Sequence, residues 1–227
     1  MMKRSPAPNP NPIDRSRKPM QAEPAVTRFG LIRHAETVWN RERRVQGQMD
    51  SPLTPQGEQQ ADRWGRALQS FSWNRILASD TGRAVATAVI INAHLNLPIE
   101  TDTRLRELDW GRWTTRTIAR IRAEELDAVE AQEAAGWEFR PPGGESRRQQ
   151  LERSRQALID AAGRGRGLGD CILVVTHEGV IKGLAHHLSG RAYIAAEAVC
   201  LRPYHLHWLT AADGRVALAG LNARALE

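Results

Sequence analysis

Cysteine is scarce in this chain of 227 residues, since Cys171 and Cys200 are the only two and they are widely separated. This spacing excludes a disulfide framework and the usual cysteine-based zinc site. We therefore interpret both cysteines as buried apolar side chains without a chemical role.

Long apolar runs are also missing. No stretch of 18 apolar residues occurs, and no apolar segment follows the basic residues near the N-terminus. The sequence thus offers neither a membrane-spanning helix nor a secretory signal peptide, and it shows no internal repeat. These absences predict a soluble, cytoplasmic protein with no membrane contact.

Charge and proline are unevenly distributed. The formal net charge is +6, and residues 1–28 hold six basic side chains against two acidic ones, together with six of the twelve prolines. Because this segment lacks helical or alternating apolar periodicity, we expect a disordered basic tail over 1–26. The single domain then covers 27–227. A basic tail can bind nucleic acid, but a solvated extension is the simpler interpretation, so we expect no nucleic-acid partner.

Within the domain, short apolar runs alternate with longer helical patterns, which is typical of a parallel sheet covered by helices. This alternation predicts an α/β fold, a three-layer α/β/α sandwich with a mostly parallel central sheet. The expected strands are 28–32, 75–79, 97–102 and 171–176, and the expected helices are 55–68, 81–95, 146–163 and 179–188. The Asp213-Gly214 pair predicts a closing hairpin within 204–221. Residues 108–145, helix-like over 115–135 but weakly apolar, are expected to form a peripheral, lid-like segment.

Two histidines follow predicted strands. His34 ends the first strand and His177 ends the apolar run 171–176, while Arg83 lies in the first turn of the helix after 75–79. In open α/β sheets, ligands bind beyond the carboxyl ends of the strands. Two guanidiniums that converge there, Arg33 and Arg83, repel each other unless an anion lies between them, and their planar donors suit phosphate oxygens. The pattern predicts a phosphoryl group as ligand.

A neutral histidine in such a cage could attack phosphorus with its free ring nitrogen if a backbone carbonyl holds the other N–H. The leaving oxygen would then need a proton. Glu107, between Leu105 and two tryptophans, is the first candidate for a partly buried general acid, and Asp109 is its competitor.

Each residue also has a plainer interpretation. Taken alone, Arg83 is a surface helix residue and Glu107 is an ion-pair partner for Arg104 or Arg106. The remaining histidines and tryptophans are best explained by packing, although Trp110 and Trp113 could border a substrate. His186, His187, His205 and His207 are expected to be structural, and no metal or other cofactor is expected.

Six segments occur in the order and approximate spacing of a known family, and the chain resembles the histidine phosphatase superfamily, with its phosphoglycerate mutase-like fold, over roughly residues 27–221. These segments are LIRHAETVWN, GQMDSPLTPQGEQQA, SDTGRAVATA, LRELDWGRW, PGGES and VVTHEGVI. The resemblance implies that His34 is the phosphate-accepting nucleophile and Glu107 the proton donor. It further implies a phosphate pocket of Arg33, Arg83 and His177, bordered by Asn40 and by residues 44–47, which include Gln46 and Gly47.

The resemblance favours the phosphatase branch, and thus a metal-independent phosphoric monoester hydrolase of the histidine acid phosphatase type that forms a phosphohistidine. Its substrate would be a small phosphomonoester. A phosphoglycerate mutase-type phosphotransferase is the alternative, and a catalytically silent phosphate- or RNA-binding scaffold is a third. Two departures from the family pattern affect the pocket, TTRTIA at 114–119 and Glu178 after His177. The natural substrate and the oligomeric state, for which a homodimer is one option, stay open.

Overall fold

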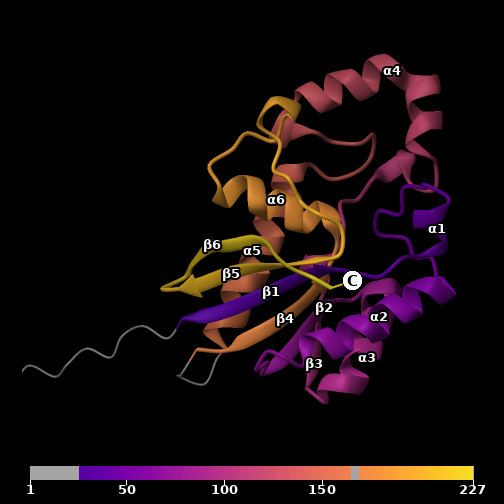
Figure 1. Cartoon of the computed structure of the whole chain (residues 1–227). Coiled ribbons are helices and arrows are strands. Elements are labelled where there is room, and N and C mark those ends of the chain that lie inside the picture. The colour runs from indigo at the N-terminus through magenta and orange to yellow at the C-terminus, as the bar shows by residue number, and fades with distance from the viewer. Residues whose placement is uncertain (1–25, 165–168, 227) are drawn as a thin grey trace, which may run out of the picture.

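One six-stranded sheet forms the centre of the molecule (Figure 1). The computed structural model describes residues 26–164 and 169–226, so the tail expected over 1–26 lies outside the described residues except for its last position. The strands stand in the order β3-β2-β4-β1-β5-β6. Their bounds are β1 Thr27–Arg33, β2 Arg75–Ser79, β3 Ile99–Asp102, β4 Cys171–Thr176, β5 His205–Ala212 and β6 Arg215–Ala225.

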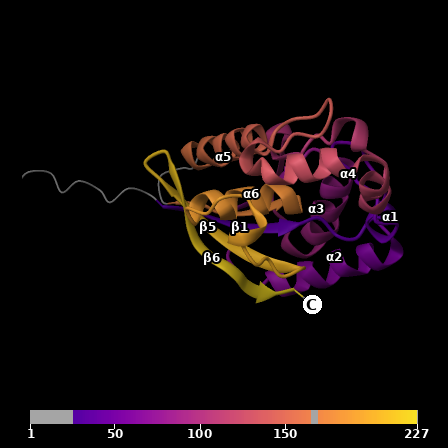
Figure 2. The ribbon, with the colours of Figure 1, turned by 90° about the horizontal axis from the view of Figure 1, so that it is seen from above.

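The sheet is mixed and mostly parallel, as predicted. The β3-β2, β2-β4 and β4-β1 pairs are parallel, whereas β5 pairs antiparallel with β1 and with β6. The β5–β6 hairpin turns at Asp213 and Gly214, both with positive φ, and lies along one margin of the molecule (Figure 2). The parallel strands β1, β2 and β4 therefore bring their carboxyl ends to one edge of the sheet.

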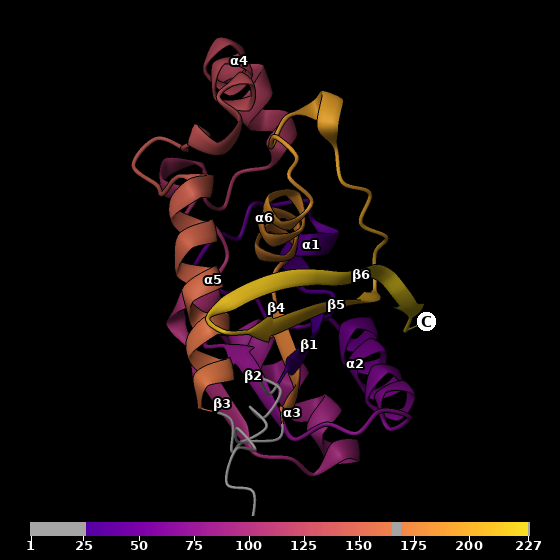
Figure 3. The ribbon, with the colours of Figure 1, turned by 90° about the vertical axis from the view of Figure 1, so that its left-hand side faces the viewer.

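Helices cover both faces of the sheet (Figure 3). The long helices are α2 Pro55–Leu68, α3 Gly82–Leu95, α4 Ile118–Ala134, α5 Arg147–Gly163 and α6 Glu178–Leu188, and α1 Val38–Arg41 is a single turn. Along β4, Leu173 and Val175 pack with α2 and α3, whereas Ile172 and Val174 pack with α5 and α6. Since alternate residues of a strand face opposite sides, this apolar run fills two cores. The α/β/α sandwich predicted from the sequence is confirmed.

Helix starts follow the capping signals in the sequence. Thr54 accepts a hydrogen bond from Gly57 N–H at 2.9 Å, with Pro55 as the first residue of α2. Ser146 forms a capping box with Gln149 at the start of α5. Thr37 forms a second capping box with Asn40, which begins the α1 turn that the periodicity did not predict because it is too short.

A separate small core lies away from the sheet, beneath α4 (Figures 1 and 3). It contains the buried side chains Val45, Leu108, Trp113, Ile121, Val129 and Phe139. Two short 3₁₀ helices accompany it, η2 Gly111–Trp113 and η3 Gly136–Glu138. Two others lie elsewhere: η1 Thr103–Leu105 places Leu105 in the core beneath α5 and α6, and η4 Ala195–Glu197 follows α6. Helix α4 is kinked at Glu125, which has non-helical dihedral angles. Its carboxylate accepts from Trp113 Nε1 at 3.0 Å, which ties the kink to this core.

The interpretation of the cysteines as buried fillers is wrong. Cys171 is only half-buried at the start of β4, and Cys200 is exposed in the connection to β5. The apolar pattern did not distinguish the buried residues of β4 from its half-buried first residue. Among the described residues, no helix is both long and apolar enough to cross a bilayer.

Candidate active site

The carboxyl ends of β1 and β4 place two imidazoles side by side. Backbone pairing continues past β1, because His34 N–H donates to Thr176 O at 2.9 Å. The His34 and His177 ring centroids are 5.2 Å apart, with an interplanar angle of 62°. Both side chains are buried, at 4% and 0% exposure. Neighbouring parallel strands that end together thus fix the two rings without help from a loop.

Arg83, from the first turn of α3, joins the two imidazoles. Its Nε donates to His34 Nε2 at 3.2 Å and its Nη2 donates to His177 Nδ1 at 3.2 Å. The other N–H groups donate to Gly47 O, Met49 O and Asp50 Oδ1 at 2.8, 2.7 and 3.0 Å. A guanidinium has five N–H donors, so every donor of this buried side chain is used. The surface-residue interpretation of Arg83 is wrong.

These bonds fix the tautomers of both rings, since a guanidinium only donates. His34 Nε2 must accept, so the proton is on Nδ1, which donates to Ala35 O at 2.8 Å. His177 Nδ1 also accepts, so its Nε2–H donates to Ser79 Oγ at 2.9 Å, at the end of β2. His34 therefore keeps a lone pair on Nε2 while a carbonyl holds its other nitrogen.

Burial and positive neighbours keep both imidazoles neutral. Burial is the main cause that lowers the pKa of His34 well below its usual value, and the charges of Arg33 and Arg83 lower it further. The pKa of His177 is lowered for the same reasons, first by burial and then by the charges of His34 and Arg83. A neutral ring is the form that can act as a nucleophile.

Glu107, in the loop after η1, lines the cavity that also contains His34 and Arg83. Its Oε1 accepts from Leu108 N–H at 2.8 Å and from Gln150 Nε2 at 2.9 Å, and its Oε2 accepts from Gly179 N–H at 3.1 Å. A Cβ at Gly179 would lie 2.2 Å from Oε1, so only glycine admits the carboxylate here. Glu107 thus contacts α5 and α6 and has no ion pair with Arg104 or Arg106, which pair with other carboxylates.

Asp109 takes a structural position instead. Its Oδ1 accepts from Gly111 N–H at 2.9 Å, and it does not line the cavity. Trp110 does line the cavity, whereas Trp113 is 1% exposed and belongs to the small core under α4. The sequence could not separate these pairs, because neighbouring residues in a tight turn differ only in the direction of their side chains.

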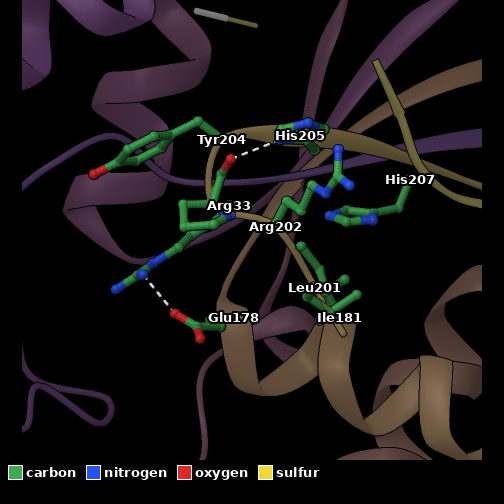
Figure 4. Close-up of a pocket in the computed structure, with 9 residues that line it drawn as sticks. Arg33, Glu178, Ile181, Leu201, Arg202, Tyr204, His205 and His207 are labelled. Carbon is green, nitrogen blue, oxygen red and sulfur yellow. Dashed lines mark hydrogen bonds and ion pairs between the residues drawn. The ribbon is translucent and has the colours of Figure 1, made fainter. Parts of the chain in front are cut away.

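Arg33 is the last residue of β1 and forms an ion pair with Glu178, the first residue of α6. Their Nη1 and Oε2 atoms are 2.5 Å apart, with the side chains 34% and 58% exposed. Figure 4 shows this ion pair at the edge of a neighbouring pocket of about 440 Å³, which Tyr204 and His205 also line. The ion pair separates this pocket from the cavity that holds His34. The Glu178 carboxylate, which the sequence marked as a departure from the family pattern, therefore points at Arg33, a cation of the proposed phosphate cage.

The remaining candidates line the same open cavity of about 1260 Å³. Gly47 has φ +54°, and its carbonyl holds Arg83, so a glycine is favoured there. Gln46 is buried, and its Oε1 has no hydrogen-bond partner among the described residues. Asn40 closes the capping box of α1. The cavity thus brings together the candidates Arg33, His34, Asn40, Gln46, Gly47, Arg83 and Glu107, with His177 directly behind.

Comparison with known proteins identifies the family. Residues 29–224 match the model of the histidine phosphatase superfamily (branch 1). The chain belongs to this superfamily.

Similar proteins include both activities of the superfamily. A protein of Salmonella choleraesuis (strain SC-B67) named "Probable phosphoglycerate mutase GpmB" is 44% identical over 128 residues, which is 56% of this chain and 60% of that protein. The alignment thus spans less than two thirds of the relative. The structure of Bacillus stearothermophilus YhfR superposes with a TM-score of 0.77 at 30% identity, covering 88% and 98% of the two chains. The mycobacterial glucosyl-3-phosphoglycerate phosphatase gives 0.75 at 29% identity, covering 88% and 100%.

Several residues that support this histidine phosphatase site carried no sequence signal. Asp50, which binds Arg83, lies in a loop, whereas Ser79 ends β2 and Thr81 follows that strand, like many other hydroxyl residues. Arg147, Lys182 and Tyr193 line the cavity. His205 and His207 share β5, and no group of three or more metal-ligating side chains occurs in residues 26–164 and 169–226.

We expect the free energy of unfolding to fall as the pH drops below about 6.5. The pKa values of His34 and His177 are lower in the folded protein than in the unfolded chain, so the unfolded chain binds more protons there. Their stabilisation is complete above the unfolded pKa and decreases by at most about 1.4 kcal/mol per pH unit for each ring. Urea unfolding between about pH 7.5 and 5.5 measures this slope.

The control is His34→Gln, which removes one titrating ring and should flatten the slope. Some slope should remain, because burial also lowers the pKa of His186 and that of His207, the latter to about 4. An unchanged slope in the variant would contradict the assignment of a neutral, buried His34.

We expect Glu178→Gln to tighten the binding of inorganic phosphate by about two- to five-fold, the equivalent of one partly exposed ion pair. The substitution frees Arg33 and removes a negative charge beside the cavity. Titration calorimetry with inorganic phosphate measures the dissociation constant. Glu138→Gln is the matched control, because Glu138 forms an exposed pair with Arg148 away from this cavity. Unchanged or weaker binding in Glu178→Gln would show that the pair does not compete with the anion.

Proposed function

We propose that this member of the histidine phosphatase superfamily is a metal-independent phosphatase that hydrolyses small phosphomonoesters through a phosphohistidine on His34. The observation that carries the proposal is the tautomer of His34. A carbonyl holds Nδ1–H at 2.8 Å, and the lone pair of Nε2 belongs to a ring that lines the cavity. This arrangement presents a neutral nucleophile in a fixed direction.

Before the first step, Arg83 Nε must release His34 Nε2, because the hydrogen bond between them at 3.2 Å occupies the only lone pair of that nitrogen. In the first step, this lone pair attacks phosphorus and the bond to the ester oxygen breaks. Protonated Glu107 donates its proton to that oxygen, so the product leaves as an alcohol. The charges of Arg33 and Arg83 offset the charge on the phosphoryl oxygens in the transition state. His177 lies behind the cavity and acts through its hydrogen bond with Arg83.

In the second step, water attacks the phosphoryl group and the phosphorus–nitrogen bond breaks. The Glu107 carboxylate takes a proton from the water, and inorganic phosphate leaves. Both His34 and Glu107 then return to their starting states. The open cavity gives water access to the intermediate, which supports hydrolysis.

A mutase is the second candidate, and the 44% identity to the GpmB protein is the observation that favours it. A mutase needs the same first step but must pass the phosphoryl group to a second hydroxyl before water arrives. The likeness to the glucosyl-3-phosphoglycerate phosphatase over the whole of that chain supports hydrolysis instead. Of the peripheral residues 108–145, Leu108, Trp110 and Ile118 line the cavity, which is open to solvent.

We expect the purified protein to release inorganic phosphate from phosphomonoesters in the presence of EDTA and without a bisphosphoglycerate primer. His34→Ala should lose this turnover, whereas His187→Ala, which changes an exposed histidine of α6, should keep it. Mass spectrometry of protein quenched during turnover should find one phosphoryl group on the peptide that contains His34. Conversion of 3-phosphoglycerate to 2-phosphoglycerate without phosphate release would favour the mutase. Undiminished turnover in His34→Ala would overturn both.

The effect of replacing Glu107 on kcat should depend on the leaving group of the substrate. Glu107→Gln keeps the size, but its NH₂ group replaces one of two acceptor oxygens, so at least one of the three hydrogen bonds is lost. The amide cannot act as a general acid, so kcat for an alkyl phosphate should fall about 10²- to 10⁴-fold. An aryl phosphate with a weakly basic leaving group should lose far less. Glu152→Gln, at an exposed position of α5, is the control. An equal loss for both substrates would assign Glu107 to binding rather than to proton transfer.

A further inference from the structure

Two basic side chains on the α5 and α6 wall of the cavity remain outside the phosphate cage. Arg147 is the first residue of α5, and Lys182 lies in the second turn of α6. Within residues 26–164 and 169–226, neither has a carboxylate at ion-pair distance. Glu133 is an acidic side chain whose charge reaches Arg147, but it pairs with Arg122.

Arg147 is held rigidly although it lacks an ionic partner. Its guanidinium lies 4.0 Å from the ring centroid of Phe139 and 4.1 Å from that of Tyr193. Nη1 donates to Gly136 O at 3.1 Å and to Tyr193 O at 3.4 Å. Tyr193 in turn stacks on His186, with centroids 4.4 Å apart. Among the described residues, the Nε and Nη2 edge of this guanidinium donates to no protein group.

Helix spacing fixes where these cations lie relative to the reaction. Arg147 is one turn before Gln150, which binds Glu107, and Lys182 is one turn after Glu178, which pairs with Arg33. Side chains three or four residues apart on a helix are neighbours, with Cβ atoms about 5–6 Å apart. Both cations therefore lie about one helical turn from residues that hold Glu107 and Arg33.

Withdrawing the Arg147 guanidinium from water without a counter-ion costs free energy, because burial disfavours its charged form. Aromatic rings on both faces offset part of this cost but leave one edge of donors unused. A planar carboxylate matches such an edge with two parallel hydrogen bonds, and the Lys182 ammonium adds a second positive charge. The arrangement is therefore that of a receptor for an anion.

We propose that Arg147 and Lys182 form a second anion-binding subsite, which receives a carboxylate or a second phosphate on the leaving group of the substrate. The inference rests on the proposed function and narrows its substrates to phosphomonoesters whose alcohol part is itself negatively charged. One small substrate can reach both subsites, because Arg147, Lys182, His34 and Arg83 line the same cavity. Glu107 and Glu178 also face the cavity, and both already have donors of their own.

A pair of substrates that differ in one group tests the subsite. 3-Phosphoglycerate and glycerol 3-phosphate differ only by a carboxylate in place of a hydroxymethyl group. We expect kcat/KM to favour 3-phosphoglycerate, and Arg147→Gln to lower kcat/KM for it by about 10- to 100-fold, the effect of charged hydrogen bonds. Turnover of glycerol 3-phosphate and of p-nitrophenyl phosphate should change little. Lys182→Gln should act in the same direction but more weakly.

Arg43→Gln is the matched control, because Arg43 is an exposed cation that lines the same cavity and its removal changes the charge equally. If Arg43→Gln and Arg147→Gln reduce the carboxylate preference to the same extent, general attraction explains it and the subsite is refuted. An equal loss for both substrates in Arg147→Gln also refutes it. Preserved turnover of p-nitrophenyl phosphate shows that the variant is folded, and Arg147→Lys provides a milder variant if it is not.

Further substrates show whether the subsite prefers a carboxylate or a phosphate. They also separate this inference from the proposed function. Propane-1,3-diol bisphosphate, compared with 3-hydroxypropyl phosphate, replaces the carboxylate by a phosphate, so the larger preference identifies the preferred group. If the wild type hydrolyses none of these esters, the proposed function fails. The subsite is then judged by calorimetry alone, where tighter binding of 3-phosphoglycerate than of glycerol 3-phosphate, lost in Arg147→Gln, supports it and equal binding overturns it.

Discussion

The guanidinium of Arg83 determines the chemical state of the whole site. It donates to one nitrogen of His34 and one nitrogen of His177, so it selects the tautomer of each ring and disfavours protonation of both. Its three remaining donors bind Gly47, Met49 and Asp50, which anchors the loop before α2 to the first turn of α3. One buried cation thus joins the strand ends, a helix start and a loop, and each of these would be misplaced without it.

The sheet supplies the rigidity that this arrangement requires. Because β1 and β4 are adjacent and parallel, their last residues lie side by side, and His34 and His177 are a direct consequence of that register. The alternating apolar residues of β4 hold the strand between two cores, so the imidazoles rest on a part of the molecule that cannot move independently. A loop then brings in Glu107, and the start of α6 brings Glu178 to the half-exposed side chain of Arg33 at the end of β1.

The sequence predicted the parts of this design that depend on periodicity. Apolar alternation and helix caps located the main strands and helices, and residues that follow strands, such as His34 and His177, could be placed at the ligand-binding edge. Side-chain direction within turns was not predictable, so Glu107 and Asp109 remained competitors. Contacts between segments distant in the chain were equally hidden, and the stack of Arg147 on Phe139 and Tyr193 has no local signal because three separate segments form it.

The cations of the site are already partnered before a substrate arrives, and this shapes what the cavity can select. Arg83 uses Asp50 and Arg33 uses Glu178, so an incoming phosphate must compete with carboxylates of this chain rather than fill an empty cage. A singly charged anion gains little over the resident carboxylates, whereas a dianion gains roughly twice the Coulomb energy from the same cations. Such competition favours phosphomonoester dianions over diesters and simple carboxylates. Arg147 differs from these two arginines, because no carboxylate of the described residues occupies the Nε and Nη2 edge of its guanidinium. In the proposed subsite, a carboxylate of the substrate can bind there without displacing a carboxylate of the protein.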